Sequence, residues 1–381
     1  MKQKAKRMFV LLLSIILLFG LVACEPKAPS QTEEGGPTSS TKPDTTSGES
    51  LIGSGKKVAM ISGFGGFGDG AINDTVLNGL KKAQELLGFD FNYSEALTPV
   101  DYEQLLSEYA DSKEYDIIFL CSADGIDPVN ALGPDYPDQK FVLYDVQVEG
   151  NPQLISQYFA KDEMGFIAGV LAALMDAEGS VTIDGIKTEY SPSGKIGLVV
   201  GVEIPSAVPV LIGAAAGIKY VRPDYEWLYG IAGSWSDNTK NKELALSMYD
   251  SGANFVFHNA GGGAMGIVAA AREQDRFMIG YDSDQTVWDP ARVIGSTRKQ
   301  SEGAIVRVMT QYFETGELAW GTAEENNASN DGVFFQYNVG FEVPSHVSEI
   351  LESVIMDLKE GKISIPSSWE EVEEFDLVFG S

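Results

Sequence analysis

The chain has 381 residues, of which 44% are hydrophobic, and this length and composition predict two packed domains and exclude wholesale disorder. Its formal net charge of -28 would repel a phosphate backbone, which excludes nucleic acid as a partner. The 2 cysteines and 2 histidines are too few for a disulfide scaffold or a His-rich metal site. Any chemistry must therefore come from carboxylates, amides, glycines and aromatic rings.

Residues 1–23 have the pattern of a secretory signal peptide. A basic stretch at residues 2–7 precedes an apolar run at 8–18 that is short for a membrane span. The segment ends in the tetrapeptide LVAC at 21–24, which resembles a bacterial lipobox. We expect cleavage before Cys24 and lipid on that cysteine, which would anchor the protein to the outer face of the cell membrane. The alternative is an uncleaved N-terminal anchor helix.

Residues 24–55 form the next segment, a predicted disordered tether that begins with the lipidated cysteine. From residue 25 it is rich in Pro, Ser, Thr, Gly and Glu and has almost no large apolar side chain, so it cannot offset the entropy of ordering. The second cysteine, Cys121, follows an apolar run and is predicted to be a buried thiol. No intramolecular disulfide remains once Cys24 carries lipid.

Short apolar runs alternate with helical patterns along the rest of the chain. The first run, at residues 57–62, is followed by a glycine-rich loop and by helical spacing of apolar residues over 73–87. Further runs lie at 115–121, 140–145, 195–201, 227–232, 255–258 and 277–282. This order is typical of α/β proteins with parallel sheets. About eight such runs exceed one compact sheet at this length, so two lobes are predicted.

The loop after the first run, GFGGFGDGAIND at residues 63–74, combines glycines with carboxylates. Its GxGxxG spacing is a weak match to a dinucleotide fingerprint, because no strand ending in an acidic residue follows about 20 residues later. The favoured interpretation is a ligand-binding loop in which Asp69, Asn73 and Asp74 supply polar contacts. Asn73 or Asp74 could equally cap the following helix, a role compatible with binding.

Other predicted strand ends carry further candidates, since ligands bind at the carboxyl ends of parallel strands. Glu203 lies in GVEIP, with a solvated turn as the alternative, and Trp235 lies in GSWSD. His258 is predicted to be a packing residue, because no second His or Cys is near it in sequence. In GYDSDQ, Asp282 and Asp284 could hold Ca²⁺ or Mg²⁺, but a hydroxyl acceptor is the favoured role of Asp282.

Several separated motifs together give a specific resemblance. They are GKIGLVVGVEIPSAVPVLIGAAAGIKYVRPD at 194–224, GSWSDNTKNKELALSMYDSGANFVFHNAGGGAMG at 233–266 and GYDSDQ at 280–285. In order and spacing the chain resembles the basic membrane protein family, the nucleoside-type substrate-binding lipoproteins of ABC transporters. The resemblance covers roughly residues 56–375. It implies a type I periplasmic-binding fold, with two doubly wound parallel-sheet lobes joined by a three-segment hinge.

The resemblance also implies a division of the chain. Crossings near residues 160, 296 and 335 would place 56–160 and 297–335 in lobe I. Lobe II would then comprise residues 161–296 and 336–381. The ligand would be held between the lobes, and lobe closure would be the signal that the permease recognises.

Three site residues carry over by position. In similar nucleoside binders the Asp of the GxDSDQ motif accepts ribose hydroxyls with help from a downstream Lys, which implies these roles for Asp282 and Lys299. The aromatic residue of the GS-aromatic segment corresponds to Trp235, a platform for a flat ring. Where the family often reads DDxSFNQ, this chain reads GDGAIND, so Ile72 and Asp74 change the face that would read a purine.

The sequence thus predicts an extracytoplasmic, monomeric lipoprotein that captures a small polar solute, a nucleoside or related ribosyl compound, and delivers it to an ABC permease. No cofactor, metal or catalytic residue is expected. One alternative is a sensor that presents its ligand to a membrane receptor. The other is a metal-dependent nucleoside hydrolase, which is disfavoured because the chain has no GxSxG, HExxH or DxDxxxDD motif.

Overall fold

The computed structural model describes residues 50–64, 66–68 and 72–380. Segment Ser50–Ser381 forms one compact unit. The predicted signal peptide, the lipidation site Cys24, nearly all of the tether and the candidate ligand residue Asp69 lie outside the described residues. Across the described part of the chain, no helix combines the length and the apolarity that a membrane crossing requires.

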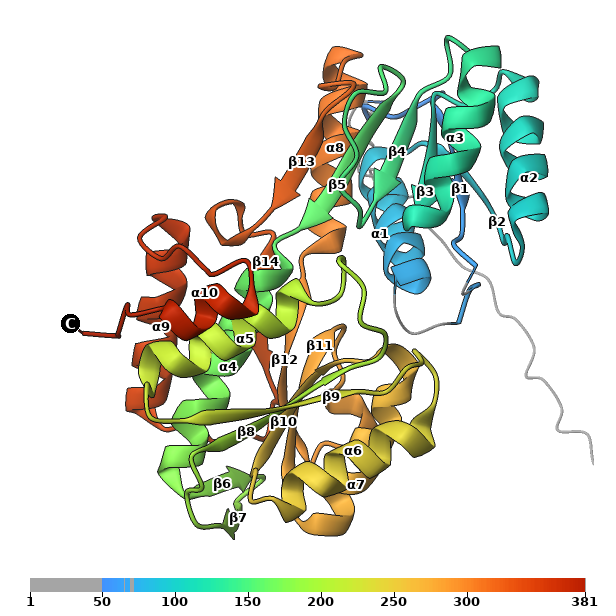
Figure 1. Cartoon of the computed structure of the whole chain (residues 1–381). Coiled ribbons are helices and arrows are strands. Elements are labelled where there is room, and N and C mark those ends of the chain that lie inside the picture. The colour runs from blue at the N-terminus through green and yellow to red at the C-terminus, as the bar shows by residue number, and fades with distance from the viewer. Residues whose placement is uncertain (1–49, 65, 69–71, 381) are drawn as a thin grey trace, which may run out of the picture. The chain divides into compact units, whose positions relative to one another are not determined.

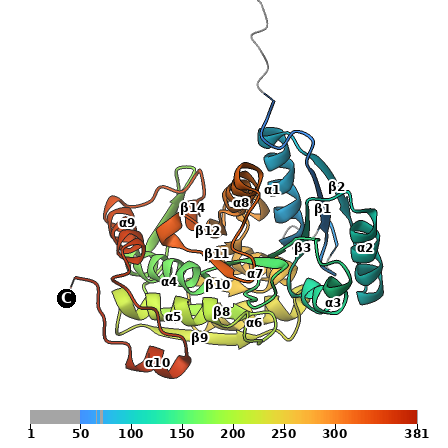
Figure 2. The ribbon, with the colours of Figure 1, turned by 90° about the horizontal axis from the view of Figure 1, so that it is seen from above.

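The first sheet is six-stranded, in the order β13-β5-β4-β3-β1-β2, and all its strands are parallel. The strands are β1 (Lys57–Ile61), β2 (Asp90–Ser94), β3 (Ile117–Cys121), β4 (Phe141–Tyr144), β5 (Leu154–Phe159) and β13 (Ala323–Asn326). The helices of this lobe are α1 (Ile72–Leu87), α2 (Pro99–Ser112), α3 (Ile126–Leu132) and α8 (Ser301–Thr315). Figures 1 and 2 show helices on both faces of the sheet.

Alternation of side chains along the buried strands explains why helices cover both faces. In β1, Met60 packs in the same core as Leu80 of α1 and Ile305 of α8. Its neighbour Ile61 points the other way and packs with Leu106 of α2. A strand buried on both faces reads as an uninterrupted apolar run, which is the pattern seen at residues 57–61 and 117–121. Cys121 ends β3 and is fully buried, as predicted.

The second sheet is also six-stranded, in the order β14-β12-β11-β10-β8-β9. Its strands are β8 (Lys195–Val200), β9 (Glu226–Ile231), β10 (Phe255–Asn259), β11 (Phe277–Asp282), β12 (Val293–Lys299) and β14 (Val333–Tyr337). Its helices are α4 (Lys161–Glu178), α5 (Pro209–Val221), α6 (Asn238–Asp250), α7 (Met265–Gln274), α9 (Ser345–Lys359) and α10 (Trp369–Glu374). The α/β prediction with two parallel-sheet lobes is confirmed, except that β14 is antiparallel to β12.

The second sheet is doubly wound in the same way. Phe257 of β10 packs in the core that includes α4 and α5, whereas Val256 packs with residues of α6 and α7. Helices α4 and α5 approach closely, because a Cβ at Gly165 would collide with the backbone carbonyl of Val210. A separate hairpin, β6 (Ser180–Ile183) and β7 (Ile186–Glu189), turns through Asp184 and Gly185 with positive φ angles of 50° and 74°.

Three passages of the described chain connect the two sheets. The chain leaves the first sheet after β5 and enters α4, returns between β12 and α8, and leaves again between β13 and β14. The third passage contains the short 3₁₀ helix η5 (Ala328–Asn330), which contacts α9. The lobe boundaries drawn at residues 160, 296 and 335 stay predictions.

Candidate functional site

A buried lysine joins the carboxyl ends of the two sheets. Lys299 is the last residue of β12, and only 2% of its side chain is exposed. Its Nζ lies 2.9 Å from Oδ1 of Asp145, which follows β4, and 2.7 Å from Oδ1 of Asp282, which ends β11. Because β4 belongs to the first sheet and β11 to the second, one cation pairs with carboxylates from both lobes.

Charge pairing determines the ionisation of this cluster. Burial by itself would lower the pKa of Lys299, but Asp145 and Asp282 raise that pKa well above its ordinary value. Burial would raise the pKa of Asp145, and Lys161 and Lys299 together lower it below its ordinary value. The Nζ of Lys161 lies 3.6 Å from Oδ2 of Asp145. Lys299 and Asp145 are therefore held in their charged forms.

Both aspartates of the cluster have backbones in the left-handed region, which non-glycine residues seldom adopt. The φ angle is 68° at Asp145 and 76° at Asp282. Such conformations cost free energy and occur most often at functional sites. The aromatic rings of Phe159 and Tyr281 surround the ammonium group, with centroids 5.7 Å and 6.0 Å from Nζ of Lys299.

Gln285 fixes the end of β11 that carries Asp282. Its amide accepts from Tyr281 N at 3.3 Å and donates to Tyr281 O at 3.0 Å. Gln285 also contacts Nε2 of the buried His258 at 2.8 Å, while Ala260 N donates to Nδ1 of that ring. Since Nδ1 accepts, Nε2 carries the proton and donates to Gln285. Burial lowers the pKa of His258 to about 4, so this neutral histidine is a packing residue, as predicted.

Residues of the first loop hold the loop itself together. Asn73 is buried, and its Oδ1 accepts from Gly63 N at 2.7 Å. Asp74 accepts from Gly68 N, also at 2.7 Å. The loop is tied to β3 because Asp124, in the turn after that strand, accepts from Phe64 N at 2.8 Å. A role of Asn73 and Asp74 in ligand binding stays a prediction.

A hollow of about 430 Å³ lies beside Lys299. Asp74, Thr75 and Asn78 line it from α1, and Arg298 and Lys299 line it from the end of β12. The structure therefore brings the predicted residues Asp74 and Lys299 to one cavity, although they are far apart in sequence.

Trp235 lies at a different point of the second lobe and is 38% exposed. Its ring covers the end of β8, where a Cβ at Gly201 would come within 2.6 Å of Cε3 of the indole. The backbone carbonyl of Trp235 accepts from Gly263 N at 2.8 Å. The glycine at position 201 allows the tryptophan ring to lie against the strand end.

Asp284, the second aspartate of GYDSDQ, turns away from Asp282. Its Oδ1 accepts from the backbone and hydroxyl of Thr286, and its Oδ2 accepts from Gln336 Nε2 at 2.6 Å. Within the described ranges, no group of three or more His, Cys, Asp or Glu side chains is placed to hold a metal ion.

The comparisons with known proteins agree with this architecture. Residues 56–368 match the family described as ABC transporter substrate-binding protein, PnrA-like. The chain belongs to this family. As a PnrA-like protein it is the solute-binding component of an ABC transporter, which implies a ligand and a permease partner. The family consists of binding proteins rather than catalysts, so the expectation that the chain is not an enzyme is confirmed by its membership.

Two curated relatives and one solved structure illustrate the similarity. The ABC transporter nucleoside-binding protein BmpA of Lactococcus lactis is 26% identical over 333 residues, covering 82% of this chain and 89% of the relative. Basic membrane protein A of Borreliella afzelii is 26% identical over 337 residues, covering 86% and 97%. An ABC transporter solute-binding protein from Aeropyrum pernix has a TM-score of 0.67 at 22% identity, covering 84% and 96%. The expected type I periplasmic-binding fold is thereby confirmed.

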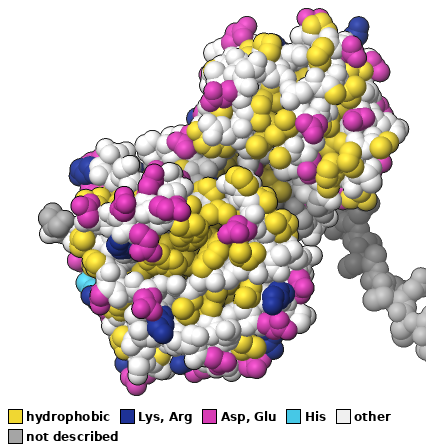
Figure 3. Space-filling model, viewed as in Figure 1, with side chains coloured by type: hydrophobic (Ala, Val, Ile, Leu, Met, Phe, Trp, Pro, Cys, Tyr) yellow, Lys and Arg dark blue, Asp and Glu magenta, His cyan; other side chains and the backbone are white. Residues whose placement is uncertain are grey.

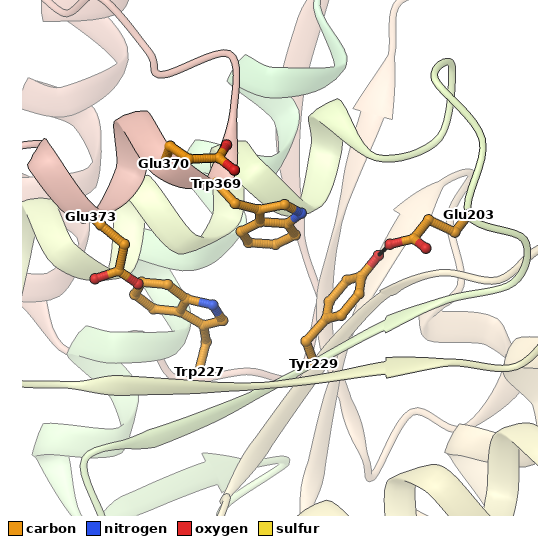
Figure 4. Close-up of a pocket in the computed structure, with 6 residues that line it drawn as sticks. All are labelled: Glu203, Trp227, Tyr229, Trp369, Glu370 and Glu373. Atoms are coloured by element: carbon orange, nitrogen blue, oxygen red, sulfur yellow. Dashed lines mark hydrogen bonds between the residues drawn. The ribbon is translucent and has the colours of Figure 1, made fainter.

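Glu203 of this PnrA-like protein lies in a second hollow. Its Oε1 accepts from the hydroxyl of Tyr229 at 3.1 Å. Figure 4 shows Glu203 beside aromatic residues of β9 and α10, a setting shared with none of the other predicted ligand residues. Among the described residues, no other predicted ligand residue lines this hollow, and the role of Glu203 in ligand binding stays a prediction.

Sequence reasoning missed Asp145 and Gln285, which complete the Lys299 cluster. Asp145 stands at the end of the apolar run 140–145. The rule that sites form at strand ends would have selected it. Gln285 ends the GYDSDQ motif at 280–285, but its contacts with His258 and Tyr281 exist only in the folded chain.

Proposed function

We propose that this chain is the extracytoplasmic receptor of an ABC importer and captures a nucleoside or a related ribosyl compound. The observation that carries the proposal is the ion pair between buried Lys299 and Asp282 at the end of β11. This pair uses Oδ1 of Asp282, and Oδ2 has no hydrogen-bond partner among the described residues. With 21% of its side chain exposed, Asp282 can be reached by a ligand.

A carboxylate of this kind suits vicinal hydroxyl groups. Asp282 forms an ion pair with Lys299, and a carboxylate accepts hydroxyl protons in strong, charge-assisted hydrogen bonds. A site shielded from water strengthens such bonds further. Trp235 offers an exposed indole face on which a flat ring can stack. The relative named as a nucleoside-binding protein supports the same ligand class.

The proposed location at the outer face of the cell membrane is inferred from the sequence. The LVAC tetrapeptide at 21–24 supports lipid attachment to Cys24, and a relative that covers most of the chain is named a membrane protein. Delivery to a permease follows from membership of a transporter family. Growth on a nucleoside as sole carbon source should depend on the chain and on its permease. Uptake that is unchanged when the chain is deleted would favour the sensor alternative.

The ligand class is tested by thermal denaturation of the full chain with nucleosides, free bases, ribose and other sugars. A ligand at 100 times its Kd should stabilise the protein by about 2.7 kcal/mol, which raises Tm by several degrees. Nucleosides should give this shift and ribose alone should not. Asp282→Asn should abolish the shift, because the amide presents a donor to the hydroxyls in place of a charged acceptor.

Asp275→Asn is the matched control. Asp275 lies just before the other end of β11 and pairs with Arg292, so its loss should leave the nucleoside shift intact. A shift with a sugar and none with any nucleoside would overturn the ligand assignment. Conversion of the nucleoside to base and ribose during incubation would revive the hydrolase.

A further inference from the structure

A second hollow, of about 460 Å³, lies on the second lobe at the edge of its sheet. We name it the aromatic pocket, and it is lined by Glu203, Trp227, Tyr229, Trp369, Glu370 and Glu373. Figure 3 shows hydrophobic side chains gathered on the face formed by β9, α5 and α10, with acidic side chains beside them. The Lys299 cluster contributes no residue to this lining.

Two distant segments build the walls of the aromatic pocket. Trp227 and Tyr229 are two residues apart on the edge strand β9, so both project from the same face of the sheet. Trp369 begins α10, where the side chain of Ser368 caps the helix by accepting from Glu371 N. The Trp369 ring stacks on Trp227 with centroids 6.4 Å apart and meets Tyr229 nearly edge-on at 5.0 Å.

Three carboxylates border these rings (Figure 4). Glu203, Glu370 and Glu373 are exposed, and none of them forms an ion pair within the described part of the chain. Lys219 lines an adjoining hollow, and its ammonium group donates to the backbone carbonyls of Val372 and Glu373. The pocket thus combines three aromatic rings with negative charge that no side chain of the lining neutralises.

The donors and acceptors of the lining are unequal. The three carboxylates offer acceptor oxygens, whereas the donors are the indole N–H groups and a tyrosine hydroxyl already bonded to Glu203. A sugar is neutral and would leave the three negative charges unbalanced, and an anion would be repelled by a chain of net charge -28. A positively charged ligand satisfies the carboxylates and is also attracted to the aromatic faces.

We propose that the aromatic pocket binds a small organic cation of the quaternary ammonium class. Such a cation has an apolar surface that contacts the rings, and its charge interacts with ring quadrupoles and with the glutamates. It needs no hydrogen-bond donor from the protein, which fits a lining poor in free donors. The aromatic pocket shares no described lining residue with the hollow beside Lys299, so the proposal does not depend on the proposed function.

The test compares choline with 3,3-dimethylbutan-1-ol, a neutral molecule of the same shape. The full chain labelled with ¹⁵N in its 5 tryptophans gives one indole signal for each residue. Trp→Phe variants assign these signals. Choline should shift the signals of Trp227 and Trp369 and leave Trp288 and Trp320 unchanged, and the neutral molecule should shift none of them. Equal shifts with both molecules would show an apolar hollow without charge recognition and would overturn the proposal.

Two variants test the roles of the glutamates and of Trp369 in choline binding. Replacing Glu203, Glu370 and Glu373 together by Gln should weaken choline binding roughly tenfold, because three weak charge interactions are lost. Glu349→Gln, an exposed glutamate on α9 outside the lining, is the control and should leave binding unchanged. Trp369→Phe should retain binding with lower affinity, because the indole attracts cations most strongly of the aromatic rings.

Two outcomes would contradict the proposal directly. The absence of any shift at Trp227 and Trp369 would mean that no cation binds there. A shift at Trp235 alone would place choline at the other tryptophan site. Circular dichroism spectra and melting temperatures of every variant establish that a loss of binding is not a loss of folding.

Discussion

Carboxylates cluster at two places in this protein. Among the described residues, they are paired with cations at one place and unpaired at the other. Asp145 and Asp282 lie around Lys299, whose side chain is 2% exposed, and each makes an ion pair with its ammonium group. The glutamates of the aromatic pocket are exposed and have no ion-pair partner within the described ranges. Because Lys161 also pairs with Asp145, the first place is locally balanced in charge, whereas the second keeps its negative potential.

Desolvation explains the difference. A carboxylate removed from water must be paired, because the cost of burying an isolated charge exceeds most other contributions to stability. Once paired, Asp282 can accept hydrogen bonds from a neutral ligand without adding an unbalanced charge. An exposed glutamate remains hydrated and needs no partner. The carboxylates of the aromatic pocket can therefore interact with a cationic ligand.

Glu163 is an intermediate case that separates burial from pairing. It lies in the first turn of α4, next to the passage from β5, and its Oε2 accepts from Ala328 N at 2.6 Å. No cation pairs with it among the described residues. Burial raises the pKa of Glu163 to about 7, so its charged form is disfavoured near neutral pH.

The largest expected effect comes from removing the buried cation. Lys299→Met keeps a side chain of similar length but leaves Asp145 and Asp282 without this partner. We expect the free energy of unfolding to fall by about 3–5 kcal/mol, the usual cost of breaking a buried ion pair from one side. Urea denaturation measures this change. Lys187→Met, in the exposed pair with Glu189 of the β6–β7 hairpin, is the control and should have little effect.

The pH dependence of this difference tests whether charge is responsible. The pKa of Asp145 is lowered from 3.8, so its contribution to stability is present above that pH and is lost as pH falls through the folded-state value. The pKa of Lys299 is raised from 10.5, so its contribution is lost as pH rises through its folded-state value. Wild type and Lys299→Met should therefore differ most between these limits. A difference independent of pH would assign the effect to packing.

Glu163→Gln should stabilise the protein at alkaline pH. Because the folded-state pKa lies above the ordinary 4.5, the contribution of Glu163 becomes less favourable as pH rises from 4.5 through about 7. Removing the charge should raise the free energy of unfolding by about 1–2 kcal/mol at pH 8, allowing for partial exposure. At pH 4 the variant and wild type should be equally stable. Urea denaturation of both proteins at pH 4 and pH 8 measures these free energies of unfolding.

The smallest effect is expected from one glutamate of the aromatic pocket. Glu370→Gln should leave Tm unchanged, since exposed charges contribute little to stability, and should weaken choline binding about twofold. Raising the NaCl concentration from 50 to 500 mM should reduce the difference, because salt screens exposed charges. Calorimetric titration measures the Kd for choline at each salt concentration, and thermal denaturation measures Tm. A Tm that falls by several degrees would show that Glu370 has a structural role.

Most of the buried strands could be predicted, whereas both edge strands of the first sheet could not. Runs such as 117–121 and 277–282 are apolar along nearly their whole length because both faces are covered by helices. In contrast, β2 reads DFNYS and β13 reads AEEN, and both lie at edges of the first sheet with few buried side chains. Backbone hydrogen bonds to one neighbour hold an edge strand in place, so its side chains need not be apolar.

The sequence by itself determined the α/β class, the apolar strands and the polar residues that follow them, because these depend on the local spacing of apolar side chains. It also placed Asp282 at the end of its strand, and the family resemblance implied Lys299 as its partner. Only the tertiary structure joined Asp145 to that pair and set Trp369 against Trp227. Such contacts depend on how distant segments pack, and no periodicity along the chain records that packing.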